Sequence, residues 1–291
     1  MSVVSFSVLT AVLCFVSGAR PWFIGGGQAG TPYLPTVDDW AAVRQIYISS
    51  ENTNIEFLAS YDGDVMIEPY HIDIRNSLEF KGEVLYITLS KDIKELTIRI
   101  PHEPHKYDVY IKAQAGRFDF RSFEMGIATI HTINASAYFY GMVCDSVTFL
   151  SVYSSLFIDN SDIYQIIAET QMGDIRVHAD FNQSRLDARS GNIVLTPSAA
   201  FVRVDIKTIS GDVNLNLSTK YGYYLDSKTS TGAPISGDFE FMPTDSLNVY
   251  KYGEAGITII IDTISGSIRA NKVKTSNETD TIDYNEITKN R

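Results

Sequence analysis

A short motif recurs along this chain at intervals of about nineteen residues, and it constrains the fold more than any other feature of the sequence. Its clearest copies are Thr208–Leu215 (TISGDVNL) and Thr263–Ala270 (TISGSIRA), which share the pattern T-x-S-G-polar-apolar-x-apolar. The glycine position of successive copies falls at residues 116, 135, 154, 173, 191 and 211, so the intervals are 19, 19, 19, 18 and 20 residues. Ala135 and Ser154 replace the glycine in two copies. A constant period of this kind is typical of proteins whose repeats stack on one another.

The residues within and between the copies alternate between apolar and polar side chains. In Asp174–Phe181 (DIRVHADF) every second side chain is apolar, and Val202–Lys207 and Asp212–Leu217 show the same alternation. Period two is the pattern of a strand with one buried face, whereas the i, i+3, i+4, i+7 spacing of an amphipathic helix does not occur in any extended window. The chain is therefore predicted to be an all-β protein.

Together, the period and the alternation predict a single-stranded β-solenoid (β-helix-like) with rungs of about nineteen residues. Each rung would add one strand spacing of about 4.8 Å and pass its apolar column to the next rung. The Ser-Gly pair is interpreted as the corner between two faces, because glycine tolerates positive φ and the preceding hydroxyl can satisfy turn backbone groups. The inward positions expected to stack into one core are Phe118, Ile175, Ile193, Val213 and Ile268.

The repeat is irregular towards both ends of the folded region. After Gly211 the motif glycine recurs at Gly237 and Gly266, at intervals of 26 and 29 residues. The extra residues, including Tyr221–Tyr224 and Asn248–Gly253, are predicted to bulge as loops or a hairpin on one side of the coil. Before the repeats, longer strands are expected, and this region is predicted to cover the exposed strand edges of the solenoid end.

Five segments are expected from these patterns: a signal peptide or membrane anchor over residues 1–24, a Gly/Pro linker over 25–43, an N-terminal β cap region over 44–111, β-solenoid repeats over 112–273 and a polar tail over 274–291. Val3–Ala19 carries no charge, and at seventeen residues it falls between a signal-peptide core and a full membrane span. Ser17–Ala19 offers a small-x-small cleavage site, but the first basic residue, Arg20, follows the run. We expect the repeats at the cell envelope, on the extracellular side, or in the secreted fraction. A partly intracellular assembly protein held by a genuine membrane anchor is a further alternative.

Charge and cysteine content exclude several classes of function. The formal net charge is −11, so phosphate backbones are repelled and nucleic acid is not expected as a partner. Cys14 lies in the apolar leader and Cys144 is the only other cysteine, which excludes a disulfide framework and a Cys-based zinc site. We expect Cys144 to be a small buried hydrophobic residue.

The repeats resemble those of the bacterial "putative adhesin" repeat domain family, a β-solenoid domain of unknown function found on envelope-associated proteins. The resemblance is carried by Thr208–Val213 and Thr263–Ile268, by the opening strand Ile46–Glu56, and by the strand Ile98–Pro101 that leads into the repeats. It covers about Arg44 to Lys272. It implies a fold and an envelope location but no active site, and the resemblance does not by itself imply adhesion.

Two motifs in the sequence resemble known site signatures without the structural context that those signatures need. Gly25–Gly30 satisfies G-x-G-x-x-G, but an apolar segment precedes it and Thr31-Pro32 follows, where a dinucleotide site needs a strand and a helix. His102 and His105 have i, i+3 rather than i, i+4 spacing, and Pro101 and Pro104 would break the helix that a helical zinc motif needs. We therefore expect no cofactor-binding residue and no metal ligand.

Outward charges and loop tyrosines are the remaining candidates for a site. Asp119, Asp174, Asp212, Arg176 and Arg269 could stack into a row of the kind that β-helix enzymes use on polysaccharides, although outward charges are usually only a solvated face. Tyrosines in the longest insertion could form a recognition patch; these are Tyr221, Tyr223 and Tyr224.

The sequence favours a non-enzymatic envelope protein, a rigid scaffold for interaction, adhesion or sensing, with no catalytic residue. Its expected partner is a protein or glycan at the cell surface, and its oligomeric state stays open. The alternative is a carbohydrate-active β-helix enzyme that uses outward carboxylates.

Overall fold

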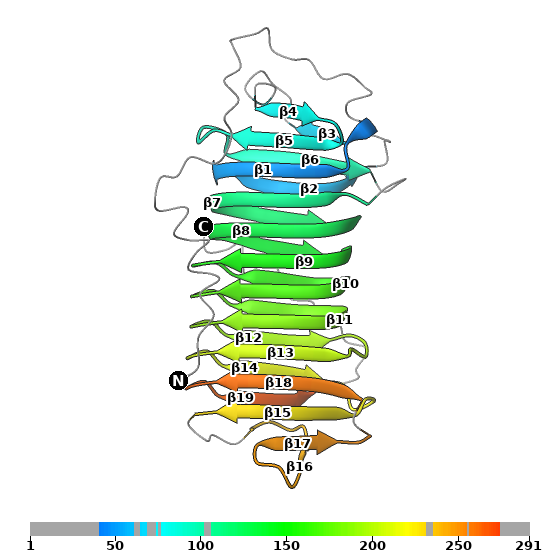
Figure 1. Cartoon of the computed structure of the whole chain (residues 1–291), viewed down its shortest axis with the longest axis vertical. Helices are drawn as coiled ribbons and strands as arrows, with labels where there is room; N and C mark the ends of the chain where they lie inside the picture. Colours follow the sequence, from blue (N-terminus) through cyan, green and yellow to red (C-terminus); the bar gives the residue numbers. More distant parts are fainter. Residues whose placement is uncertain are drawn as a thin grey trace.

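The computed structural model describes residues 41–60, 65–68, 74, 77–101, 106–230, 235–254 and 256–273. These residues form an elongated all-β stack in which the strands lie across the long axis (Figure 1). The first eleven strands are β1 (Gln45–Asn52), β2 (Asn54–Ser60), β3 (Met66–Glu68), β4 (Leu78–Lys81), β5 (Val84–Leu89), β6 (Glu95–Pro101), β7 (Asp108–Arg121), β8 (Glu124–Tyr140), β9 (Val143–Ser151), β10 (Leu156–Thr170) and β11 (Ile175–Ala188). The others are β12 (Ile193–Pro197), β13 (Arg203–Thr208), β14 (Val213–Leu217), β15 (Tyr223–Thr229), β16 (Met242–Pro243), β17 (Val249–Tyr252), β18 (Ile257–Thr263) and β19 (Ile268–Lys272).

Parallel pairing between successive turns confirms the predicted β-solenoid and its period. Gly116 of β7 pairs with Ala135 of β8, nineteen residues later. Ile175 of β11 pairs in register with Ile193 of β12. Each rung therefore presents the same positions of the repeat to the rung below it.

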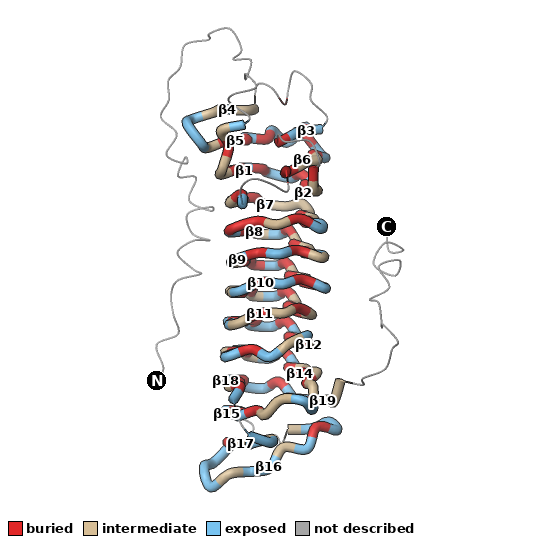
Figure 2. The backbone as a smooth tube through the Cα atoms, turned by 90° about the vertical axis from the view of Figure 1, so that its right-hand side faces the viewer, coloured by how far each residue is buried: buried red, intermediate tan, exposed pale blue. Residues whose placement is uncertain are grey.

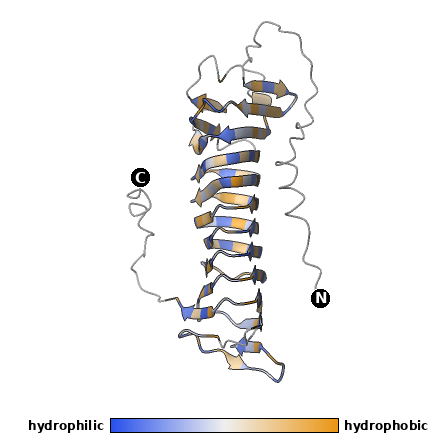
Figure 3. Cartoon of the chain, turned by 90° about the vertical axis from the view of Figure 1, so that its left-hand side faces the viewer, coloured by the Kyte–Doolittle hydropathy of each residue, from blue (hydrophilic) through white to orange (hydrophobic). Residues whose placement is uncertain are grey.

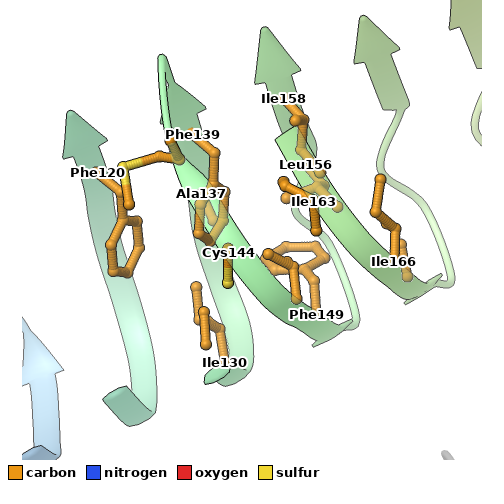
Figure 4. Close-up of a cluster of buried hydrophobic side chains, with 14 of the residues drawn as sticks. Phe120, Ile130, Ala137, Phe139, Cys144, Phe149, Leu156, Ile158, Ile163 and Ile166 are labelled. Atoms are coloured by element: carbon orange, nitrogen blue, oxygen red, sulfur yellow. The ribbon is translucent and has the colours of Figure 1, made fainter. Parts of the chain in front are cut away.

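The core is a set of vertical columns of apolar side chains between the two faces of the solenoid. Buried positions recur from rung to rung along the stack (Figure 2). All five inward positions expected from the repeat are buried, and they belong to one column, which contains Ile55, Phe118, Ala137, Leu156, Ile175, Ile193, Val213 and Ile268. In the neighbouring column the ring of Phe120 stacks on those of Phe57 and Phe139, with 4.4 Å between centroids in each pair. Figure 4 shows part of this interior, where aromatic and branched side chains from successive rungs fill the space between the faces. The alternation of hydropathy along each strand is visible in Figure 3.

The motif glycines are required by space more than by backbone conformation. A Cβ on Gly173, Gly191, Gly211 or Gly266 would lie 1.7–1.9 Å from a carbonyl oxygen of the neighbouring rung, closer than any real contact. None of these four has positive φ, whereas Gly116 does, at +131°. The interpretation of the glycines as positive-φ corners is therefore wrong for most copies, because the backbones of stacked corners approach too closely for a side chain.

The threonine of the motif closes the same corner with its hydroxyl. The amide of Gly211 donates to Oγ1 of Thr208 at 2.8 Å, and the amide of Gly173 donates to Oγ1 of Thr170 at 3.0 Å. These threonines are buried, so the hydroxyl replaces the water that an exposed turn would use. The serine before the glycine also contributes at one corner, since Ser265 Oγ donates to the carbonyl of Ile209 at 2.9 Å.

The order of rungs departs from the order of sequence at the N-terminal end. β1 pairs in parallel with both β5 and β7, and β2 pairs with both β6 and β7. The first rung of the sequence, β1–β2, therefore lies between β5–β6 and β7. The strands β4 and β3 pair antiparallel with β5 and β6 and cover that end of the stack (Figure 1).

The C-terminal end is interlocked in the same way. β18 lies between β13 and β15 and pairs in parallel with both, and β19 pairs with β14. The residues predicted to bulge from one side instead form the last rung and its cover: β15 continues the stack and β17 pairs antiparallel with it. The prediction is wrong for Tyr221–Tyr224, because Tyr223 and Leu225 alternate inward and extend the core column. Asn248–Gly253 does form a hairpin with β16, but this hairpin covers the end of the stack.

The described residues contain no helix that is both long enough and apolar enough to cross a membrane. The expected leader at 1–24, most of the linker at 25–43, the tail at 274–291, the glycine motif at 25–30 and the histidines at positions 71, 102 and 105 lie outside the described residues.

Candidate functional site

The five outward charges considered for catalysis lie on one face of the solenoid, in two separate columns. Asp174 and Asp212 share the column that follows the motif glycine. Asp119, Arg176 and Arg269 share the next outward column of the same face. The repeat therefore gathers these side chains on one surface, as the spacing suggested, but it distributes them along the stack.

The carboxylates of the first column hold neighbouring rungs together. The backbone amide of Asn192 donates to Oδ1 of Asp174 at 2.9 Å, and the backbone amide of Asp212 donates to Oδ1 of Asn192 at 3.0 Å. One rung further, the amide and hydroxyl of Ser267 donate to Oδ1 of Asp212 at 2.8 and 2.7 Å. We call this column, Asp174–Asn192–Asp212–Ser267, the corner ladder.

Hydrogen bonding also favours the ionised form of Asp212 in the ladder. Hydrogen bonds from Ser267 hold the pKa of the Asp212 carboxyl below its ordinary value; the bond from the hydroxyl has the larger effect and the bond from the backbone amide the smaller. A carboxyl kept ionised in this way is poorly suited to donate a proton as a general acid. Asp212 therefore serves the stack and is a weak candidate for acid catalysis.

Asp119 is held by arginine on the same outward surface. The guanidinium of Arg117 donates two hydrogen bonds to Asp119, at 2.7 and 2.9 Å, and lies 4.0 Å from the ring centroid of Tyr138. Tyr138 in turn stacks on Phe157 at 4.7 Å. These contacts form a ladder of charge and aromatic rings on a flat strand surface.

The repeat also brings together an acid, an imidazole and a hydroxyl that the sequence did not single out. Asp159, His178 and Thr196 follow one another in register on three successive rungs. Oδ1 of Asp159 and Nδ1 of His178 lie 2.7 Å apart, which orients the imidazole. Oγ1 of Thr196, however, accepts a hydrogen bond from the side-chain amide (Nδ2) of Asn216 at 2.9 Å. The 19- and 18-residue spacings of these residues were the signal that could have revealed the column.

A second missed pair lies on the other outward face. Glu169 pairs in register with Asp187, and Arg185 contacts Glu169 at 3.2 Å. The pKa of the Asp187 carboxyl is raised, mainly by burial and to a smaller extent by the negative charge of Glu169. This pair is separated by the core from the five charges that the sequence suggested.

The histidines do not assemble into a metal site within the described part of the chain. The pKa of His131 is lowered, mainly by burial and to a smaller extent by the charge of Lys112. His178 is hydrogen bonded to Asp159. Over the described ranges, no three His, Cys, Asp or Glu side chains are placed to hold a metal ion. Cys144 is buried, as expected, and burial raises the pKa of its thiol to about 12.

A groove of about 590 Å³ lies at the C-terminal end of the solenoid. It is lined by Thr219, Lys220, Tyr221, Gly222, Glu240, Phe241, Met242, Tyr252, Gly253 and Glu254. We call it the end groove. It lies where the loop before β15 meets the segments around the β16–β17 hairpin.

The three tyrosines proposed as one recognition patch do not lie together: Tyr221 precedes β15, and the alternation of β15 turns Tyr223 inward and Tyr224 outward. Tyr221 lines the end groove. Tyr223 is buried in the core, donates its hydroxyl to the carbonyl of Ser218 at 3.1 Å, and has its pKa raised by burial to about 12. Tyr224 points outward and is 40% exposed. Only Tyr221 therefore belongs to the groove, and its aromatic partners, Phe241 and Tyr252, were not singled out by the sequence.

Comparison with known proteins identifies the repeat. The family model described as Toastrack DUF4097 matches residues 70–271, and this match confirms the family resemblance of the Ser-Gly repeats. No curated protein matches the chain. Among solved structures, a "putative cell adhesion protein" from Clostridium sporogenes ATCC 15579 shares 12% identity over 80% of this chain and 92% of that one, with a TM-score of 0.22. Similarity at that level does not bear on function.

Proposed function

Because this chain belongs to the Toastrack DUF4097 family, a β-solenoid-like domain of unknown function, we propose that it is a non-enzymatic scaffold of the cell envelope. It holds rigid outward surfaces ready for a protein or glycan partner, on the extracellular side or in secreted form. An N-terminal anchor or signal peptide would place it there.

The observation that carries the proposal is the structural use of the outward charges. Asp174 and Asp212 accept hydrogen bonds from the next rung, and Asp119 is held by Arg117. A catalytic pair needs carboxyls that are free to exchange protons with a substrate. These side chains instead hydrogen bond to neighbouring groups of the stack.

Rigidity supports a role in recognition. The backbone of each central rung is paired on both sides, and the core columns run through the whole stack. A surface that is already ordered loses little conformational entropy when a partner binds.

The experiment combines turnover and binding with the purified full-length chain. We expect no release of reducing sugar from glycan pools, and retention of the protein on isolated cell envelopes. Sugar release that Asp119→Asn or Asp187→Asn abolishes, with the circular dichroism spectrum unchanged, would establish the enzyme instead. Protease accessibility in intact cells tests the location: digestion of the repeats by external protease is expected, and full protection would contradict it.

A further inference from the structure

The end groove has aromatic walls that are held in place from behind. Phe239 is buried, and its ring lies 5.6 Å from Tyr223, 4.9 Å from Phe241 and 4.5 Å from Tyr252, measured between centroids. Tyr223 continues inward to Phe201, with 6.3 Å between ring centroids, and so connects the groove to the core. The core therefore fixes the wall rings Phe241 and Tyr252 before any ligand arrives.

Both signs of charge surround these rings. Lys220 lies among the lining residues with Glu240 and Glu254, and Glu240 is paired with Lys272 at 3.0 Å. A highly charged ligand of either sign would meet a like charge in this groove. Ammonium, carboxylate and phenol groups can all exchange hydrogen bonds with uncharged hydroxyls.

The size and shape also restrict the ligand. A volume of about 590 Å³ lies within the range of sites for small molecules and short chains. Amphipathic aromatic rings suit a ligand that has apolar faces and polar edges. Sugar rings have this combination, since their C–H faces are apolar and their edges carry hydroxyls.

We propose that the end groove binds a neutral oligosaccharide, with the lining rings Tyr221, Phe241 and Tyr252 packing on sugar rings and Lys220 and Glu254 bonding to hydroxyls. The proposal rests on the scaffold function and names the class of ligand that one of its surfaces takes. It also gives the end of the stack a role different from that of the flat faces, which carry paired charges.

Titration calorimetry on the full-length chain tests the proposal. The probes are three neutral trisaccharides (maltotriose, cellotriose and triacetylchitotriose) and one acidic trisaccharide, trigalacturonic acid. We expect at least one neutral probe to bind and the acidic one not to bind. Tyr252→Ala and Tyr221→Ala should each weaken binding by about tenfold or more, as expected for loss of a central aromatic contact. Tyr252→Phe should retain most of the affinity, because its ring can still pack on Phe239.

Tyr153→Ala is the matched control, because Tyr153 is 56% exposed at a corner in the middle of the stack, away from the groove. If Tyr252→Ala does not fold, Tyr221→Ala provides the same test. Absence of binding by all three neutral probes at millimolar concentration, or binding that neither substitution weakens, overturns the proposal.

The outcomes also separate this proposal from the scaffold function. Retention of the protein on cell envelopes, together with failure of every neutral trisaccharide to bind, overturns the groove proposal and leaves the scaffold function standing. Envelope-protein binding that requires Tyr252 without any sugar binding makes the groove a protein site. Cleavage of a probe contradicts the scaffold itself.

Discussion

At the scale of single residues, each corner of the solenoid depends on a glycine that leaves room for the backbone of the next rung. A Cβ on Gly191 would lie 1.8 Å from the carbonyl oxygen of Gly173. A backbone contact of this kind is relieved only by moving a whole corner, which affects the register of the rungs on both sides.

Gly191→Ala is therefore expected to lower the free energy of unfolding by about 1–3 kcal/mol, the range of overpacking in a close-packed interior. Chemical denaturation followed by circular dichroism measures the change. Gly256→Ala is the matched control, because Gly256 has no atom within 4 Å of its Cβ position and no positive φ. Equal stability of the two variants would show that the corners are not closely packed in solution.

The buried hydroxyls of the motif differ in their hydrogen bonding, and this difference is testable. Oγ1 of Thr208 accepts the amide of Gly211 at 2.8 Å, whereas Oγ1 of Thr132 is buried and has no hydrogen-bond partner among the described residues. Thr208→Val should cost about 1–3 kcal/mol, because it leaves a buried amide without an acceptor. Thr132→Val should be neutral or stabilising in the same denaturation experiment. The reverse order of stabilities would contradict this account.

At the scale of elements, the corner ladder links strands that are far apart in sequence and makes the link sensitive to acid. The pKa of Asp212 is held below its ordinary value by the hydroxyl and amide of Ser267. A carboxyl with a lowered folded pKa contributes stability that is present above the unfolded pKa, about 4, and that is lost as the pH falls through the folded value.

The melting temperature of the wild type should therefore fall more steeply below about pH 4 than that of Asp212→Asn, whose amide oxygen accepts the same bonds without titrating. Ser267→Ala removes the largest cause of the shift and should also reduce the acid sensitivity. Thermal denaturation across the pH range measures all three proteins. Parallel curves for the wild type and Asp212→Asn would show that the ladder does not couple β14 to β19 through this charge.

The interlocked C-terminal strand makes a second prediction at this scale. β18 is hydrogen bonded to β13 on one side and β15 on the other, although it lies near the end of the described chain. Its amides should exchange with solvent as slowly as those of β11 in the middle of the stack, and more slowly than those of the β16–β17 hairpin. Hydrogen-exchange mass spectrometry of the full chain gives the order. Exchange of β18 at the rate of β17 would mean that the last rung separates from the stack.

At the scale of the whole molecule, the two ends restrain the stack. In a simple repeat protein the terminal rungs can detach one at a time, because each rung touches only its neighbours. Here one strand at each end is inserted between strands that are not its neighbours in the sequence: β1 lies between β5 and β7, and β18 lies between β13 and β15. Antiparallel strands cover both ends. Opening the middle of the stack is therefore expected to require unfolding of the whole.

The rate at which the Cys144 thiol is modified measures this opening of the stack. Cys144 is buried in the middle of the stack, and burial raises the pKa of its thiol to about 12, so the reactive thiolate is scarce at neutral pH. In a Cys14→Ser background, a thiol reagent should modify Cys144 at the rate of global unfolding measured by circular dichroism. Labelling much faster than unfolding would demonstrate local opening of the central rungs.

Much of the central stack was predictable from the sequence. The register of Ile175 on Ile193 and the inward column through Phe118 and Val213 follow from spacing and alternation, which every repeat carries locally. The end groove was predictable only through Tyr221, because Phe241 and Tyr252 come together after the chain has returned on itself.

The sequence by itself determined the rung length, the inward columns and the corner motif, because each depends on residues within one repeat and on its copy in the next. Only the tertiary structure decided which rungs are neighbours at the two ends. β15 and β18 have the same inward alternation and either could pair with β13, so local pattern does not distinguish them. The choice is made by closure of the whole chain, in which inserting β18 between two rungs pairs its backbone on both sides and leaves the β16–β17 hairpin to cover the end.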